Sequence, residues 1–346
     1  MGAFGSDERE AVRGNVQNSV FVPKWTTPRG FGALAEGVDV EAERLDRGGD
    51  GERLGQGGDA GRLRGEVRRI ALEEVWTSAA LAGSSLSYDE TAALVERGVA
   101  IGGRRLEDYV LTADYAAAAR FAANAPPAGR RRIFLRMEEI VALHAIATRR
   151  EPGARPGAWR TTTAPAFASG VVPPPAWLVP REMAAFVERI ASGPASHPHR
   201  LVWIADAHER FARIHPFSNA NGRAVRLLTN LLLARIGLPP FAVRGVAIER
   251  YHVALRRADA RDLWPLATVL ARAVLASLRR LTAASDRDAD LQPLATFATG
   301  ARRAALYKAA QRGRLRSVRR AGRLLTSAAW LAEYEGRHPG SALPRA

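Results

Sequence analysis

Hydrophobic residues recur at intervals of three and four along most of this chain, which is the spacing of an amphipathic helix. The pattern predicts helices over residues 63–75, 88–97, 106–123, 132–148, 181–191, 201–214 and 224–236, and closing helices within 251–274. Residues 227–233 are apolar on nearly every side, as is typical of a helix buried at the centre of a bundle. The pattern therefore predicts a mostly α fold.

Three stretches interrupt the helical pattern. Residues 1–62 are rich in glycine and charge and are expected to be largely disordered. In the Pro- and Thr-rich stretch before residue 181, residues 159–163 and 168–172 are predicted to form the two arms of a β-hairpin. A polar break at 283–290 predicts a boundary between a helical domain, 63–283, and a smaller module at 291–346.

The C-terminal module differs in pattern and in charge. Its residue pattern predicts a helix over 301–311, short strands at 315–318 and 323–326, and a last helix capped by Ser327. From residue 299 onwards there are 11 Arg or Lys and 2 Asp or Glu, a net charge of +9. This order resembles the winged helix-turn-helix of excisionase-type modules, which implies binding to double-stranded DNA. The residues expected to contact phosphates are Lys308, Arg312, Arg316, Arg319, Arg320 and Arg323. A basic appendage packed on the rest of the protein is the alternative.

Composition narrows the chemistry. The chain of 346 residues has a formal net charge of +16, which suggests an anionic partner such as a nucleotide or nucleic acid. It has no cysteine, which excludes disulfides, zinc fingers and cysteine nucleophiles. No basic-then-apolar leader and no run of 18 apolar residues occurs, so we expect a cytoplasmic protein without a membrane partner.

A polar loop joins the two most apolar helical patterns and reads HPFSNANGRAVR from His215 to Arg226. The first backbone N–H groups of a helix have no partner within it, so they form an anion site. Gly222 permits close approach of a ligand, and Arg223 and Arg226 share one helix face, from which they can fork around an anion. His215 lies beside them as a candidate general base. These residues predict a polyphosphate site with a proton acceptor.

The same residues resemble the signature of the Fic family, His-Pro-Phe-x-(Asp/Glu)-Gly-Asn-Gly-Arg-x-x-Arg. The resemblance implies a Fic-type helical bundle with a β-hairpin flap that holds the target by strand addition. It implies a protein adenylyltransferase that moves AMP from ATP, with Mg²⁺, to a Ser, Thr or Tyr hydroxyl of a target protein. The implied residues are His215 as catalytic base and Phe217, Asn219, Ala220, Asn221, Gly222, Arg223 and Arg226 as ATP-binding positions, with Asn219 also at the metal position.

Two positions depart from the signature and leave alternatives open. Asn219 replaces the acidic metal ligand, and an amide offers Mg²⁺ only a neutral oxygen. Ala220 replaces glycine, as in the Doc-type toxins that phosphorylate their targets, but those have lysine where this chain has Gly222. A Doc-like kinase is therefore one alternative. A non-enzymatic regulator that senses nucleotide and binds DNA is the other.

Residues 76–84 resemble a degenerate version of the inhibitory helix found in Fic proteins, whose pattern is Ser/Thr-x-x-x-Glu-Gly/Asn. With Ser78 and Gly83 aligned on that pattern, Ala82 stands where the inhibitory glutamate would be. The resemblance then implies that the brake is missing and that Arg226 is free for a γ-phosphate. The alternative is an ordinary helix end before a turn.

Three further side chains with polar atoms lie in apolar helical patterns. His144 and His208 are expected to pack or to cap helices rather than to act in the site. Tyr251 is expected either near the adenine or in the packed core.

Overall fold

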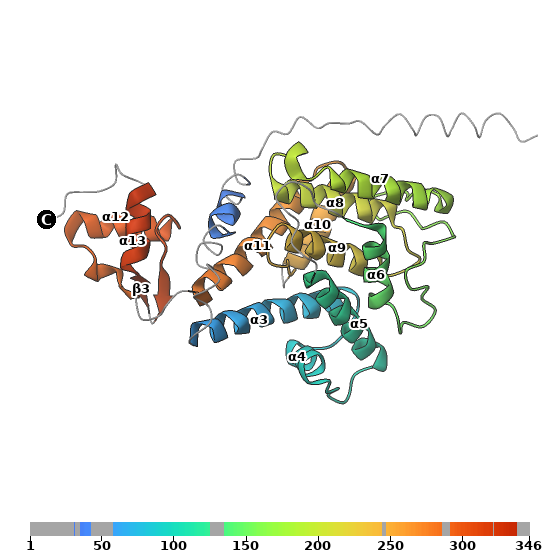
Figure 1. The fold of residues 1–346 in the computed structure, drawn as a ribbon, viewed down its shortest axis with the longest axis horizontal. Coiled ribbons are helices and arrows are strands. Elements are labelled where there is room, and N and C mark those ends of the chain that lie inside the picture. Colours follow the sequence, from blue (N-terminus) through green and yellow to red (C-terminus); the bar gives the residue numbers. More distant parts are fainter. Residues whose placement is uncertain are drawn as a thin grey trace, which may run out of the picture.

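The structure is a computed structural model that describes residue 31 and residues 35–42, 58–124, 135–243, 247–285, 291–320 and 322–337. A helical bundle forms its larger part (Figure 1). Its helices are α3 (Gly58–Leu81), α4 (Tyr88–Arg97), α5 (Leu106–Ala123), α6 (Met137–Ala147), α7 (Val179–Ala191), α8 (Arg200–Ile214), α9 (Asn221–Arg235), α10 (Ala247–Asp259) and α11 (Trp264–Ser285). The short 3-10 helices η1 (Ala176–Leu178) and η2 (Pro194–Ser196) precede α7 and α8.

Helices α8 and α9 form the centre of the bundle, and the predicted central helix is confirmed. Leu227, Leu231 and Leu233 are fully buried, and α9 contacts α3, α5, α6 and α8. Helix α11 packs against α3, α8 and α10 on another side of this pair. A helix buried all round must bring its polar atoms to internal partners, which places the loop between α8 and α9 inside a rigid frame.

Local signals for helix ends are also confirmed. Ser87 caps α4, because its hydroxyl accepts from the Glu90 N–H and the Glu90 carboxylate accepts from the Ser87 N–H. Helix α4 stops at Gly98, whose φ of 68° lies in the left-handed region that ends many helices.

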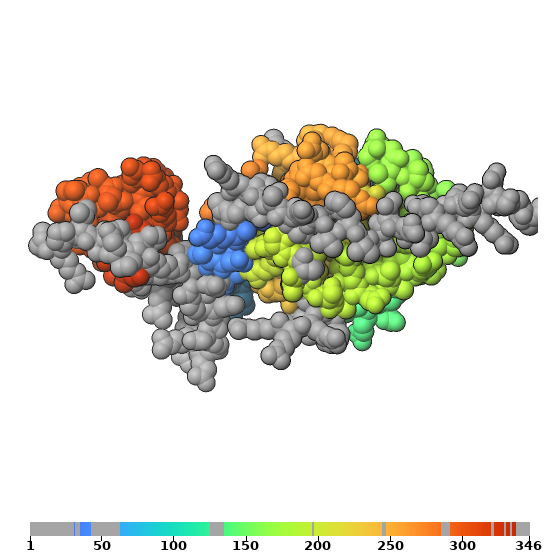
Figure 2. Space-filling model, turned by 90° about the horizontal axis from the view of Figure 1, so that it is seen from above, coloured from blue at the N-terminus to red at the C-terminus, as the bar shows by residue number. Residues whose placement is uncertain are grey.

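Residues 35–42 depart from the disorder expected for 1–62. They are helical, and Phe31 and Val38 belong to the main hydrophobic core. Asp39 accepts from Arg200 of α8 at 2.7 Å, and Glu41 accepts from Thr282 of α11 at 2.9 Å. Figure 2 shows this segment in blue against the body of the protein. Residues 1–30 and 43–57 lie outside the described residues, so the expectation for them stays a prediction.

The β-hairpin predicted before α7 is wrong. Instead of pairing with the second arm, Trp159 forms a β-bridge with Phe217, and the Arg160 N–H donates to Pro216 O at 2.9 Å. Residues 167–171 form a tight turn, closed by the Phe167 N–H on Val171 O at 2.8 Å, rather than an arm. Prolines at 165 and at 173–175 lack the N–H groups that a hairpin ladder needs.

The C-terminal module has its own small core and a three-stranded antiparallel sheet of order β1-β3-β2. Its elements are β1 (Gln292–Pro293), η4 (Leu294–Thr296), α12 (Gly300–Gln311), β2 (Val318–Arg320), β3 (Arg323–Thr326) and α13 (Ala328–Arg337). The first strand predicted here, 315–318, begins later, because Leu315 is buried in the module's core instead. Residues 338–346 lie outside the described residues.

None of the helices in the described part of the chain is long and apolar enough to cross a membrane.

Candidate functional site

The loop between α8 and α9 changes direction through two residues with left-handed backbone. His215 ends α8 with φ 50° and ψ 58°, and Ala220 precedes α9 with φ 55° and ψ 15°. A residue with a Cβ pays about 1 kcal/mol or more for this conformation, which glycine adopts without strain. Two such residues in six positions persist only because their surroundings hold them.

Asn221 closes this loop from within. Its Oδ1 accepts from the Phe217 N–H at 3.0 Å, and its Nδ2 donates to Phe217 O at 2.8 Å. The side chain is buried and engaged on both sides. Phosphate contact by this side chain stays a prediction, and in the structure its amide shapes the loop.

Phe217 anchors the loop on α6. Its ring is fully buried and stacks on His144, with centroids 3.6 Å apart and planes 5° apart. The Gly157 N–H donates to His144 Nδ1 at 3.0 Å, so the imidazole proton sits on Nε2 and donates to Asn219 O at 3.3 Å. Burial lowers the pKa of His144 to about 4. His144 is therefore a packed neutral histidine, as expected, and it also supports the loop.

The N-terminus of α9 carries no side-chain cap, because Ala220 occupies the capping position. The first N–H bonded within the helix is that of Ala224, which donates to Ala220 O at 2.9 Å. The N–H groups of residues 221–223 precede it and have no intrahelical acceptor. Gly222 is exposed, so the backbone there is open to a ligand. The loop thus presents an uncapped helix N-terminus, which favours an anion.

Arg223 and Asn219 meet at a carboxylate that the sequence pattern did not single out. Arg223 is buried; its Nη1 donates to Ala147 O at 3.1 Å and its Nη2 forms an ion pair with Glu151. The other carboxylate oxygen of Glu151 accepts from Asn219 Nδ2 at 2.9 Å. Glu151 lies in a Pro- and Gly-rich loop just beyond α6, and its sole signal in the sequence is that it follows Arg149 and Arg150, which lie after the end of that helix.

Arg226 is not free, which corrects the prediction from the degenerate inhibitory helix. Its Nε donates to Ser78 Oγ and its Nη2 to Ser78 O, both at 3.0 Å. Ser78 lies in the last turns of α3, so the helix that lacks a glutamate at Ala82 still holds this arginine. The hydroxyl and carbonyl of Ser78 are neutral, so their hold on the arginine is weaker than an ion pair.

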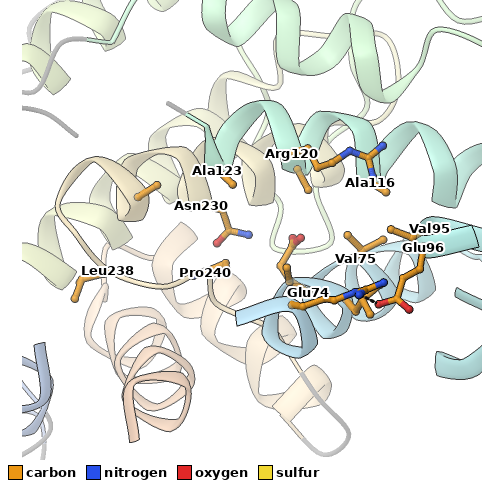
Figure 3. A pocket seen from close by; sticks show the side chains of 15 residues that line it. Glu74, Val75, Val95, Glu96, Ala116, Arg120, Ala123, Asn230, Leu238 and Pro240 are labelled. Atoms are coloured by element: carbon orange, nitrogen blue, oxygen red, sulfur yellow. Dashed lines mark ion pairs between the residues drawn. The ribbon is translucent and has the colours of Figure 1, made fainter. Parts of the chain in front are cut away.

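Glu74 lies one turn before Ser78 and is the second carboxylate that sequence reasoning missed. It is 2% exposed, and its Oε1 accepts from Tyr115 Oη at 2.5 Å. Burial raises the pKa of Glu74 to about 7, against the lowering effects of the Tyr115 hydrogen bond and the Arg226 charge. It lines a cavity of about 560 Å³ between α3, α4, α5 and α9. Figure 3 shows Glu74 and Asn230 pointing toward one another across this cavity.

His215 has the protonation state that a general base requires. Burial lowers its pKa, a hydrogen bond to the Ala212 backbone raises it, and the nearby Arg160 charge lowers it. The net effect is a lowered pKa, so the imidazole is neutral at pH 7. Phe167 of the loop before α7 covers the ring, with centroids 5.3 Å apart. One ring nitrogen is used on Ala212, which leaves the other able to accept a proton.

His208 and Tyr251 form a packed pair that lies close to Arg226 of α9. His208 Nδ1 lies 2.9 Å from Thr229 Oγ1, and its Nε2 lies 2.9 Å from Tyr251 Oη. Both side chains are buried, so His208 packs as expected and the packing alternative holds for Tyr251.

Comparison with known proteins identifies the class of domain that contains this loop. The Fic/DOC family profile matches residues 134–233, which include α6, α8, the loop and nearly all of α9. This chain therefore contains a Fic/DOC family domain.

Particular relatives agree with that class. The chain is 26% identical over 229 residues to "Protein adenylyltransferase Fic" of Culex quinquefasciatus, with 66% of this chain and 45% of the relative covered. It is 25% identical over 228 residues to "Protein adenylyltransferase fic-1" of Caenorhabditis elegans, with 66% and 44% covered. The chain thus spans less than half the length of these curated relatives.

Solved structures share the fold. A Fic domain-containing signaling protein from Bacteroides thetaiotaomicron superposes with a TM-score of 0.61 at 20% identity, covering 73% of this chain and 99% of the other. Fic-1 of Caenorhabditis elegans superposes with a TM-score of 0.61 at 23% identity, covering 81% and 77%.

The raised pKa of Glu74 predicts a specific pH dependence of stability. The folded state holds this proton more tightly than the unfolded chain, whose pKa is near 4.5, so the free energy of unfolding falls as pH rises from 4.5 to about 7. The fall attributable to Glu74 is about 3 kcal/mol. Urea unfolding at pH 5 and pH 8 should show this extra loss in the native protein and not in Glu74→Gln. Glu96→Gln, at the rim of the same cavity, serves as control, and equal pH dependence in all three proteins would refute the assignment.

Proposed function

We propose that this protein is a protein adenylyltransferase that transfers AMP from ATP to a Ser, Thr or Tyr hydroxyl of a target protein. The observation that carries the proposal is the arrangement of the loop, in which His215, whose pKa is lowered, ends α8 and five residues separate it from the uncapped N-terminus of α9. A proton acceptor beside an anion site suits attack by a hydroxyl on a phosphate. The names of the matched relatives support the same activity.

In the proposed reaction, His215 takes the proton of the target hydroxyl as its oxygen attacks the α-phosphorus of ATP. The new P–O bond forms as the bond to the β-phosphate oxygen breaks, and pyrophosphate leaves with the electron pair. Backbone N–H groups at Gly222 and Arg223 bind phosphate oxygens and stabilise the charge that develops on them. Asn221 and Phe217 keep the loop in the conformation that aims these groups.

The residues around Asn219 fit a magnesium ion. Asn219 Oδ1 is buried and has no hydrogen-bond partner among the described residues, and the Glu151 carboxylate lies against the same amide. Hard cations such as Mg²⁺ take oxygen ligands and bind through few protein groups when phosphates supply the rest. Asn219 would hold the ion, with Glu151 supplying negative charge nearby. When bound, Mg²⁺ neutralises the charge on the leaving pyrophosphate.

Label transfer tests the reaction. Incubated with Mg²⁺ and ATP labelled at the α-phosphate, the purified protein should label itself or a protein in added cell extract, and His215→Ala should lower that labelling at least 100-fold. His199→Ala is the control, because it removes the histidine at the opposite end of α8 from His215. Label from the γ-phosphate alone would replace the proposal with the Doc-like kinase. Bound ATP without transfer in any extract would favour the nucleotide-sensing regulator.

Restoring the acidic residue tests the metal site. Asn219→Asp should tighten Mg²⁺ binding in the presence of ATP by roughly tenfold, because a full charge replaces a neutral oxygen. Without metal, the new carboxylate faces Glu151, so the melting temperature should fall and recover when Mg²⁺ is added. Mn²⁺ titration followed by electron paramagnetic resonance and thermal melts measure both effects. Ser218→Asp is the control, because Ser218 is exposed and precedes Asn219 in the sequence. Equal Mn²⁺ affinity in the two variants would exclude Asn219 as a ligand.

The C-terminal module is a second candidate site, for double-stranded DNA as a winged helix-turn-helix. The observation in favour is the sheet that joins α12 and α13 around a separate core, with Lys308, Arg312, Arg319 and Arg323 exposed. Arg316 is engaged on the protein, because it covers Trp330 at 4.1 Å and donates to Thr282 O at 2.9 Å. It therefore serves the docking of the module rather than a phosphate.

DNA binding would be strongly salt-dependent. Arg319→Gln combined with Arg323→Gln should weaken binding to duplex DNA and reduce the slope of log K against log salt by about two. Fluorescence anisotropy between 50 and 200 mM salt measures it. The matched control is Arg256→Gln with Arg257→Gln on the bundle. An unchanged slope, or no binding by the native protein, would leave the module as a docked appendage.

A further inference from the structure

A buried arginine at the start of the loop before α7 has no acidic partner. The Arg160 side chain is 3% exposed, and no carboxylate of the described residues lies within ion-pair distance of it. Burying a cation costs free energy unless polar groups take the place of the water molecules that would solvate it. The contacts of Arg160 therefore indicate its role.

Carbonyl oxygens alone surround the guanidinium, and they come from three segments. Its Nε donates to His215 O at 2.7 Å, its Nη1 to Thr162 O at 3.0 Å, and its Nη2 to both Ile214 O at 3.3 Å and Pro174 O. Its own backbone N–H donates to Pro216 O at 2.9 Å. Arginine suits this arrangement because its planar fork presents several fixed donors, whereas lysine presents a point charge.

The acceptors of Arg160 lie at the end of α8 and on the two sides of the loop that covers His215. Ile214 and His215 end α8, where unpaired carbonyls carry the negative end of the helix dipole and attract a cation. Thr162 and Pro174 lie on the two sides of the loop that covers His215. We call residues 161–174 the flap. A single side chain therefore joins both sides of the flap to the backbone of His215.

We propose that Arg160 is a positioning residue that holds His215 in its left-handed conformation and fastens both sides of the flap over it. It acts through His215 and the flap and touches neither substrate. The inference rests on the proposed function, because a held base and a fixed flap matter only if a target hydroxyl is aligned there. The described residues 161–174 form no hairpin ladder, so Arg160 supplies part of the contact that strand pairing would otherwise make.

The same geometry places a positive charge beside the imidazole. The Arg160 charge contributes to the lowered pKa of His215, after the larger effect of burial. Removing the charge should therefore raise the pKa of His215. A purely structural residue would change stability without moving this pKa, so the titration separates the two roles.

The test compares Arg160→Gln, Arg160→Lys and, as control, Arg155→Gln. Arg155 is exposed, and among the described residues its side chain donates to Thr161 Oγ1 at 3.2 Å, a flap contact outside the carbonyl cluster. Arg160→Gln should raise the His215 pKa, followed by NMR of the imidazole protons, and should lower kcat about 100-fold by misplacing the base. The KM for the target should rise while ATP affinity stays within about twofold. Arg160→Lys keeps the charge, so it should keep the pKa but lose most of kcat. Arg155→Gln should leave the His215 pKa, kcat and the ATP affinity unchanged.

Several results would overturn the proposal. A folded Arg160→Gln with native kcat and native His215 pKa would show that the contacts have no effect on the base. If neither Arg160 variant folds by circular dichroism, Arg160 is a residue of the fold rather than a positioning residue. If the native protein transfers no label, the proposed function fails. The proposal on Arg160 is then judged by the pKa and by proteolysis of the flap, which should quicken in Arg160→Gln and not in Arg155→Gln.

Discussion

The site depends on how two helix ends are treated inside one buried loop. Helix α8 ends in carbonyls and α9 begins with N–H groups, and both sets are left without partners by helix geometry. The carbonyl groups at the end of α8 accept hydrogen bonds from Arg160, whose remaining side-chain hydrogen bonds go to carbonyl groups of the flap. The N–H end has no side-chain cap, because Ala220 has nothing to offer. The protein therefore neutralises the end that repels phosphate and leaves open the end that attracts it.

The buried charges around the loop are more positive than negative, which also favours an anion. Arg160, Arg223 and Arg226 are each less than 9% exposed, and their nearby carboxylates are Glu151 and Glu74. With a pKa of about 7, Glu74 carries only part of a charge at neutral pH. The loop thus holds more positive than negative charge in a place where water is scarce. A polyphosphate would correct that imbalance, so the proposed binding of ATP has a physical basis that does not depend on any one arginine.

Sequence reasoning succeeded where structure is set by neighbours along the chain. The bounds of α5, the capping box at Ser87 and the central burial of α9 follow from spacing and local hydrogen bonds, and all three are confirmed. It failed where a partner lies far away. Arg226 meets Ser78 across 148 residues, and no periodicity reveals that pairing. The hairpin prediction was wrong for a related reason, because the first arm pairs at Trp159 with Phe217 and not with the second arm.

The departure of Asn219 from the family signature acquires a meaning from Glu151. Two carboxylates in contact repel, and one of them would have to take up a proton or move away. An amide at position 219 donates to Glu151 through Nδ2 instead, and its oxygen, Oδ1, is buried without a hydrogen-bond partner among the described residues. The negative charge expected at position 219 is thus carried by Glu151, which contacts Asn219 and also forms an ion pair with Arg223. The asparagine and the glutamate are in this sense one arrangement, and a change at either position alters the electrostatics of both.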